Sequence, residues 1–181
     1  MLKPHFRALH TLLLVLIHMI MAEPCFARSE QEIKAAYVYH FIKFVQWPSG
    51  YQQPSLNICT LDDTPIVRRL EPLAGQRLNN QTIRVTPLSS HDKDIQKTIA
   101  NCTVTYIGRL NADRLTSILP WLAKQTTLTI SDIEGFADKG GMIEFVKLGD
   151  LIRFDINLKQ AKEANLFISS KLLELAHSVK R

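Results

Sequence analysis

Short apolar runs alternate with amphipathic stretches along residues 56–130. The apolar runs predict four strands, at residues 56–61, 82–88, 103–107 and 127–130. The amphipathic stretches predict three connecting helices, at residues 64–73, 92–100 and 112–124. Strands that alternate with helices form crossover units, so this part of the chain predicts a mostly parallel sheet.

The hydrophobic pattern changes after residue 141. Met142–Leu148 and Leu151–Asn157 flank Gly149 and Asp150, which predict a tight type II′ hairpin turn because glycine occupies the first central position. Two short helical segments follow the hairpin, up to Leu175. We therefore expect an α/β fold, with three α/β/α layers and a mostly parallel sheet that ends in an antiparallel hairpin.

A long helix precedes these elements. Ser29 and Glu32 form a capping box, and the helix is expected to run to about Gln46, because Trp47 and Pro48 follow it. Its apolar residues cover more than one face. Such a helix must be buried, either in the core of the domain or against a partner.

The N-terminus predicts export. Basic residues precede an apolar run at Leu12–Ile17, and small residues flank a cleavage point after Ala27. We expect residues 1–27 to be a signal peptide and residues 28–181 to form a single domain in the periplasm. Cleavage after Ala22 and an uncleaved anchor are the alternatives.

Cleavage leaves two cysteines, Cys59 and Cys102. An even pair in an exported chain predicts one disulfide, while two free buried cysteines are the alternative. Neither residue lies in a C-x-x-C motif, which disfavours a redox or metal role.

Charge and motifs then exclude several functions. The formal net charge is +5, and the basic residues are scattered, so nucleic-acid binding is not expected. The sequence lacks nucleotide-cofactor motifs and the G-x-S-x-G nucleophile motif. His40, His91 and His177 are too dispersed to suggest a zinc site. We expect no cofactor, no metal and no catalytic residue, and hence no enzyme.

The loop after the last parallel strand is a candidate ligand loop. Its residues are Ser131, Asp132, Gly135, Gly140 and Gly141. Ligands of open α/β sheets bind beyond the carboxyl ends of strands, and glycines let backbone N–H groups approach a ligand. The same glycines are equally explained by tight turns that need positive φ.

Three charged residues form a candidate polar face on the hairpin. The expected register places Glu144 opposite Asp155, with Arg153 diagonal to Glu144. Facing carboxylates could serve acid–base chemistry or a hard cation. We expect instead that Arg153 neutralises both carboxylates.

Three segments carry a family resemblance: AAYVYHFIKFVQWP (35–48), LTISDIEGFADKGGMIEFV (128–146) and IRFDINLKQAKEANLFISSKLLELA (152–176). Together they resemble the YfiR family of exported bacterial proteins, over nearly the whole mature chain and in the family's order. Cys59 and Cys102 also fall where that family can hold its disulfide. The chain departs from the family at His40 and Gln46, where Asn and Glu are usual, and at Glu144, where Asn is common.

The resemblance implies a periplasmic repressor. It would bind the sensory domain of an inner-membrane diguanylate cyclase, restrain cyclic di-GMP synthesis and so control biofilm formation. The resemblance further implies a disulfide that supports the active fold, a homodimer, and no direct membrane insertion after signal cleavage. The alternative function is a small-ligand-binding module, or an adaptor for another envelope sensor, that uses the Ser131–Gly141 loop.

Overall fold

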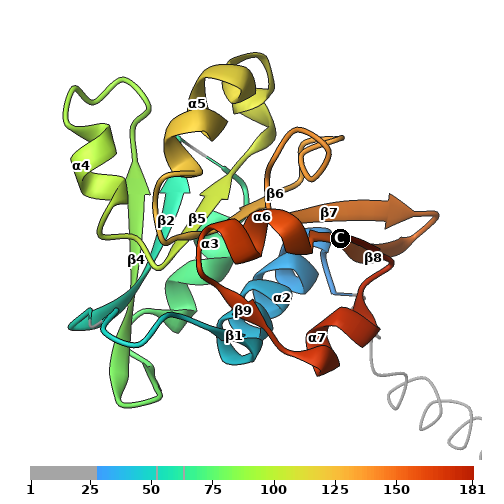
Figure 1. The fold of residues 1–181 in the computed structure, drawn as a ribbon, viewed down its shortest axis with the longest axis horizontal. Helices are drawn as coiled ribbons and strands as arrows, with labels where there is room; N and C mark the ends of the chain where they lie inside the picture. The colour runs from blue at the N-terminus through green and yellow to red at the C-terminus, as the bar shows by residue number, and fades with distance from the viewer. Residues whose placement is uncertain (1–27, 52, 63) are drawn as a thin grey trace, which may run out of the picture.

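An eight-stranded sheet with helices on both faces organises the structure (Figure 1). The computed structural model describes residues 28–51, 53–62 and 64–181. In spatial order the strands are β10 (Ser178–Lys180), β8 (Leu151–Asn157), β7 (Ile143–Leu148), β6 (Leu128–Ser131), β5 (Val104–Ile107), β2 (Ser55–Leu61), β4 (Gln81–Leu88) and β3 (Arg77–Leu78). Neighbouring strands are parallel except in the pairs β3–β4 and β7–β8. The predicted α/β fold with a mostly parallel sheet is confirmed.

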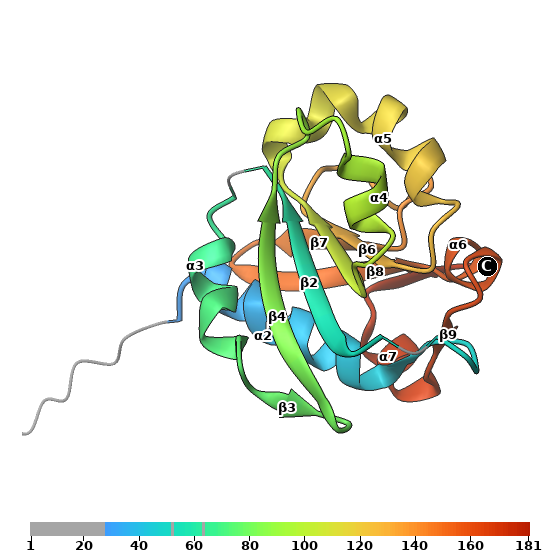
Figure 2. The same cartoon turned by 90° about the vertical axis from the view of Figure 1, so that its left-hand side faces the viewer.

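Two hydrophobic clusters pack against the opposite faces of the sheet. The helices are α2 (Glu30–Phe44), α3 (Val67–Leu70), α4 (Ile95–Ile99), α5 (Leu115–Leu122), α6 (Leu158–Glu163) and α7 (Ser170–Leu175), with 3₁₀ turns η1 (Glu71–Leu73) and η2 (Arg109–Arg114). One cluster receives residues from α2, α3, α6 and α7, and the other receives residues from α4 and α5. Figure 2 shows α4 and α5 on the side of the sheet opposite α2, α3 and α7. The three-layer arrangement follows from this division.

The long N-terminal helix is a core element. The Ser29–Glu32 capping box is present, because each residue's backbone N–H donates to the other's side chain. Phe41 is fully buried against the rings of Phe145 and Phe154. The helix ends at Phe44 rather than near Gln46, because the next two residues leave it to pair as β1 (Val45–Gln46) with β9 (Phe167–Ile168).

All three predicted connecting helices are shorter than expected, and the segment 92–100 is helical only in α4. The segment 64–73 forms α3 and then the 3₁₀ turn η1, which contains Pro72 near its start. The segment 112–124 is divided between η2 and α5, and α5 accommodates Pro120. Proline removes a backbone donor, which explains why regular helical hydrogen bonding is interrupted where η1 begins. The division between η2 and α5 lies six residues before Pro120, so this proline does not account for it.

The hairpin forms with the predicted register. Leu148 pairs with Leu151 and Glu144 with Asp155. Gly149 has φ +58° and Asp150 is not among the residues with positive φ, as a type II′ turn requires. The hairpin is not the edge of the sheet, however, because β10 adds parallel to β8 beyond it.

The strand order contains a reversal. The chain passes from β2 to β4 on one side, then crosses back to place β5 and β6 on the other side of β2. The loops that leave the carboxyl ends of β2 and β5 therefore diverge to opposite sides. In open α/β sheets such a reversal opens a crevice in which ligands bind.

Candidate functional site

A cavity of about 910 Å³ lies at the carboxyl ends of β2, β5 and β6. Its walls come from the segments that follow these strands, from α3 and from the first turn of α2. The lining residues with polar or charged side chains include Thr64, Arg68, Arg69, Tyr106, Arg109 and Asp132. The volume is within the range of small-molecule sites, about 300–1,000 Å³.

The Asp132 carboxylate interacts with two basic side chains at the carboxyl ends of the strands. The Lys34 Nζ donates to its Oδ2 at 2.8 Å, and the Arg109 Nε lies 3.6 Å from the same oxygen. Arg109 Nε also donates to the Asp132 backbone carbonyl at 3.2 Å. Lys34 forms a second ion pair at 2.6 Å with Glu30, one turn earlier on α2. Asp132 thus connects the end of β6 to the first helix, α2.

Burial makes these charges unusual. Lys34 is 1 % exposed and the Asp132 side chain is 11 % exposed. Two charges withdrawn from water are tolerated when they pair with each other. The hydrogen bond from Lys34 holds the pKa of the Glu30 carboxyl below its usual value, against the effect of partial burial. Burial raises the pKa of the Tyr106 hydroxyl, and the negative charge of Asp132 raises it further.

Two buried oxygens beside the cavity have no hydrogen-bond partner among the described residues. They are Asp132 Oδ1 and Thr64 Oγ1. Thr64 is 3 % exposed and its methyl group packs against Gly108, at the start of the β5–η2 segment. An orphaned buried oxygen costs free energy, so both atoms are candidates for contact with a bound group.

The remainder of the predicted ligand loop has a different role. The carboxylate of Glu144 accepts the backbone N–H groups of Gly135, at 2.8 Å, and Ala137, at 2.9 Å. The Ser131 hydroxyl donates to the Ile107 carbonyl at 2.7 Å and accepts the Ile133 N–H at 3.0 Å. These groups hold the loop in place.

The loop glycines are explained by local geometry. Gly135 and Gly140 have φ +72° and +104°, which favours glycine. Gly141 has no room for a Cβ, because it would overlap the buried Phe136 ring. Among the five residues of the predicted loop, Asp132 lines the cavity at the strand ends.

The three charged residues of the predicted polar face, Glu144, Arg153 and Asp155, each interact with a different part of the chain. Glu144 holds the loop, whereas Asp155 lies 2.9 Å from the Nδ1 of His177, the residue before β10. Arg153 donates to the Leu175 carbonyl at 3.4 Å and pairs ionically with neither carboxylate. The expectation that Arg153 neutralises both is wrong, because His177 and two backbone amides take those positions.

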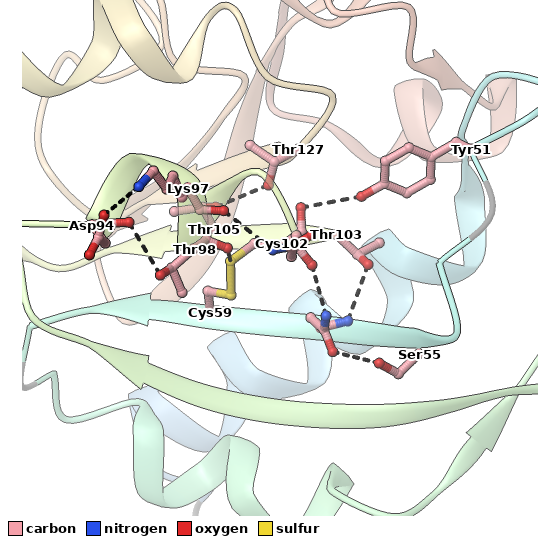
Figure 3. The surroundings of a disulfide bond; sticks show 12 residues. Tyr51, Ser55, Cys59, Asp94, Lys97, Thr98, Cys102, Thr103, Thr105 and Thr127 are labelled. Carbon is pink, nitrogen blue, oxygen red and sulfur yellow. Dashed lines mark hydrogen bonds and ion pairs between the residues drawn. A yellow bond between two sulfur atoms is a disulfide. The ribbon is translucent and has the colours of Figure 1, made fainter.

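The disulfide joins Cys59 of β2 to Cys102, which follows α4, with their Cα atoms 5.8 Å apart (Figure 3). Both residues are buried. The Tyr51 hydroxyl donates to the Cys102 carbonyl at 3.4 Å. The predicted pairing is confirmed, and it ties the α4 connection to the central strand.

Three further observations concern other functions. Within residues 28–51, 53–62 and 64–181, His, Cys, Asp and Glu side chains form no group of three or more that could hold a metal ion. In the same part of the chain no helix has the length and apolarity to cross a bilayer. The predicted signal peptide, residues 1–27, lies outside the described residues.

The residues of this site that sequence reasoning missed include Lys34, Thr64, Arg68, Arg69, Tyr106 and Arg109. Lys34 gave one usable signal, its position four residues after Glu30 on the same helix, which favours an ion pair between them. Tyr106 and Arg109 gave none, because their position depends on which strands are neighbours.

Comparisons with known proteins place the fold and the family. The model of the YfiR/HmsC-like family matches residues 31–177. A conserved domain protein from Vibrio cholerae O1 biovar El Tor is 13% identical with a TM-score of 0.60, covering 84% of this chain and 60% of that one. The ABC domain in complex with L-Trp from Streptococcus pneumoniae is 11% identical with a TM-score of 0.55, covering 82% and 60%. These two likenesses concern the fold, and the chain spans about 60% of the length of each structure. A search of curated proteins gives no match.

Proposed function

Because the chain belongs to the YfiR/HmsC-like family, we propose that it binds the periplasmic sensory domain of an inner-membrane diguanylate cyclase and represses it. The family match supports a periplasmic regulator of a diguanylate cyclase. Repression lowers cyclic di-GMP synthesis and thereby biofilm formation. The observation that carries the proposal is the family match over residues 31–177, which includes nearly all of the described fold.

Two structural observations support a regulatory role. The buried Cys59–Cys102 disulfide suits an oxidising compartment. Glu144 and Asp155, the facing carboxylates of the hairpin, have separate partners, which favours structural roles for both over acid–base catalysis. We extend the proposal to export through cleavage of residues 1–27, to a single domain over residues 28–181, and to a homodimer.

The test begins with partner identification. The mature chain is purified from native envelopes under mild cross-linking, and the membrane proteins that come with it are identified. We expect a protein with a periplasmic sensor and a cytoplasmic cyclase domain. Purified sensor domain should then bind the mature chain with saturation in calorimetry, and recovery of a different sensor, without a cyclase, would move the function to the adaptor alternative.

A cellular readout separates binding from repression. Deleting the gene for this chain should raise cyclic di-GMP, and the rise should vanish in a strain that also lacks the identified cyclase. Reintroducing the wild-type chain should restore repression. A deletion that leaves cyclic di-GMP unchanged while the complex still forms would contradict repression.

Signal-peptide cleavage and homodimer formation are tested by separate measurements. Mass spectrometry of the periplasmic protein should give an N-terminus at Arg28 if cleavage follows Ala27. Sedimentation of the mature chain should give twice the monomer mass if the homodimer forms.

A further inference from the structure

The geometry points to a binding site in the cavity at the β2, β5 and β6 strand ends for a small organic oxyanion. The ligand class is a carboxylate or phosphate ester that also carries a hydroxyl or amino group. This inference rests on the cavity alone and is independent of the proposed repression of a cyclase.

Three guanidinium groups surround the cavity, those of Arg68, Arg69 and Arg109. Arg68 forms no ion pair with another described residue, and Arg69 reaches Glu32 through a single terminal nitrogen at 3.0 Å. Arg109 contacts Asp132 through Nε, and its two terminal nitrogens form no hydrogen bond or ion pair with the described residues. A guanidinium has five N–H donors, so most of the donors here are uncommitted, and their planar fork matches an oxyanion.

The acidic residues of the cavity do not cancel this positive charge. Lys34 lies behind the cavity wall and pairs with both Glu30 and Asp132. Lys147 adds a third contact, 3.6 Å from the other oxygen of Glu30. Because these two ammonium groups compensate the carboxylates, the arginines leave the cavity with an excess of positive charge.

Two unpaired oxygens that line the cavity indicate that the ligand carries a hydroxyl or amino group. Asp132 Oδ1 can accept a hydrogen bond and Thr64 Oγ1 can donate or accept one, and neither has a partner among the described residues. A bare anion would satisfy the arginines and leave Asp132 Oδ1 unpaired. A ligand that bears a hydroxyl or amino group beside its anionic group would satisfy both ends.

Access to these two oxygens is compatible with the exposure of Arg109. Its side chain is 69 % exposed and lies over Asp132, so it can rotate away without disturbing the core. The site also coincides with the reversal of strand order between β2 and β5, where open α/β sheets place their ligands. The cavity, its positive charge, its two unpaired oxygens and the strand order therefore all indicate a ligand site at the ends of β2, β5 and β6.

The test uses the mature chain, residues 28–181, labelled with ¹⁵N, and three probes: inorganic phosphate, malate and glucose 6-phosphate. We expect saturable shifts of the Thr64, Gly108 and Leu110 amides, with malate or glucose 6-phosphate binding more tightly than phosphate. The tighter of the two identifies the anionic group as carboxylate or phosphate. Absence of saturable shifts with all three probes, or phosphate binding as tightly as both organic probes, would overturn the inference.

Variants locate the site. Arg68→Ala combined with Arg109→Ala should weaken every probe at least about tenfold, since hydrogen bonds to charged groups are involved. Arg84→Ala, an exposed arginine of β4 outside the cavity, is the matched control and should leave affinity unchanged. Thr64→Val should weaken the organic probes and spare phosphate. Equal affinities in the Arg68/Arg109 and Arg84 variants would contradict the site.

Discussion

The Lys34 ammonium lies 2.8 Å from the Asp132 carboxylate, although the two residues are 98 positions apart in the chain. The pair connects the first helix, α2, to the end of β6. Lys34 is 1 % exposed, and Asp132 and Glu30 are the carboxylates that pair with its ammonium group. Removing Lys34 takes away the shortest ionic contact of Asp132, whose side chain is 11 % exposed, and leaves the longer one from Arg109 at 3.6 Å.

We therefore expect Lys34→Met to lower the free energy of unfolding by about 3–5 kcal/mol. Urea denaturation of the mature chain measures the change. Lys97→Met is the control, because Lys97 pairs with Asp94 at 2.8 Å on the surface, where its side chain is 85 % exposed. Such a pair contributes about 0–1 kcal/mol. Similar losses in the two variants would contradict a stabilising role for the buried pair.

The lowered pKa of the Glu30 carboxyl predicts that the fold loses stability in acid. Its pKa is held below the ordinary value of 4.5, chiefly by the hydrogen bond from Lys34. A group whose pKa is lower in the folded state stabilises the fold above its unfolded pKa, and that contribution disappears as pH falls through the folded value. Stability should therefore decline below about pH 4.5.

Glu30→Gln isolates this contribution. Urea midpoints measured between pH 6 and pH 3 should fall less steeply in the variant than in the wild-type chain. Glu163→Gln, an exposed carboxylate of α6, should leave the wild-type slope unchanged. Parallel slopes for Glu30→Gln and wild type would remove the assignment.

Reduction of the disulfide should destabilise the fold. Cys59 and Cys102 close a loop with a sequence separation of 43, which in the chain-entropy model contributes about 4 kcal/mol. Urea denaturation with and without a reductant measures the loss. The variant with both cysteines replaced by alanine is the control, since its stability should be low and insensitive to the reductant. If the proposed repression depends on this fold, the same variant should repress the cyclase weakly.

Much of the fold is predictable from local sequence patterns. The four parallel strands follow from apolar runs, the hairpin register from Gly149 and Asp150, and the disulfide from the count of two cysteines after signal cleavage. Each of these signals comes either from a few neighbouring residues or from the number of cysteines. These signals therefore predict the fold without information on which strands are neighbours in the sheet.

The site depends on long-range order and was mostly missed. Lys34, Arg109 and Asp132 meet because β5 returns to the far side of β2, and the sequence of strands does not specify that reversal. Arg153 was assigned wrongly for a similar reason. The partner of Asp155 is His177, which directly precedes β10, and the hydrophobic pattern did not predict this final strand.

Glu144 is predicted to order the loop rather than to catalyse. Glu144→Gln replaces one accepting oxygen with a donor, so one of the Gly135 and Ala137 amides loses its acceptor. We expect a loss of about 1–3 kcal/mol and faster hydrogen exchange at that amide. Glu134→Gln, an exposed carboxylate of the same loop, is the control and should change neither quantity. Unchanged exchange in Glu144→Gln would contradict the ordering role.

Gly141 should be intolerant of alanine because of packing and not because of a ligand. A Cβ at this position would overlap the ring of Phe136, which is fully buried, whereas one at Gly140 has its nearest neighbour at 3.7 Å. Overpacking costs about 1–3 kcal/mol, so Gly141→Ala should lower stability by that amount. Phe136→Leu in the same chain should recover part of the loss, which a double-mutant cycle in urea measures. Strictly additive losses would show that Phe136 is not the obstacle, and the glycine would then need another explanation.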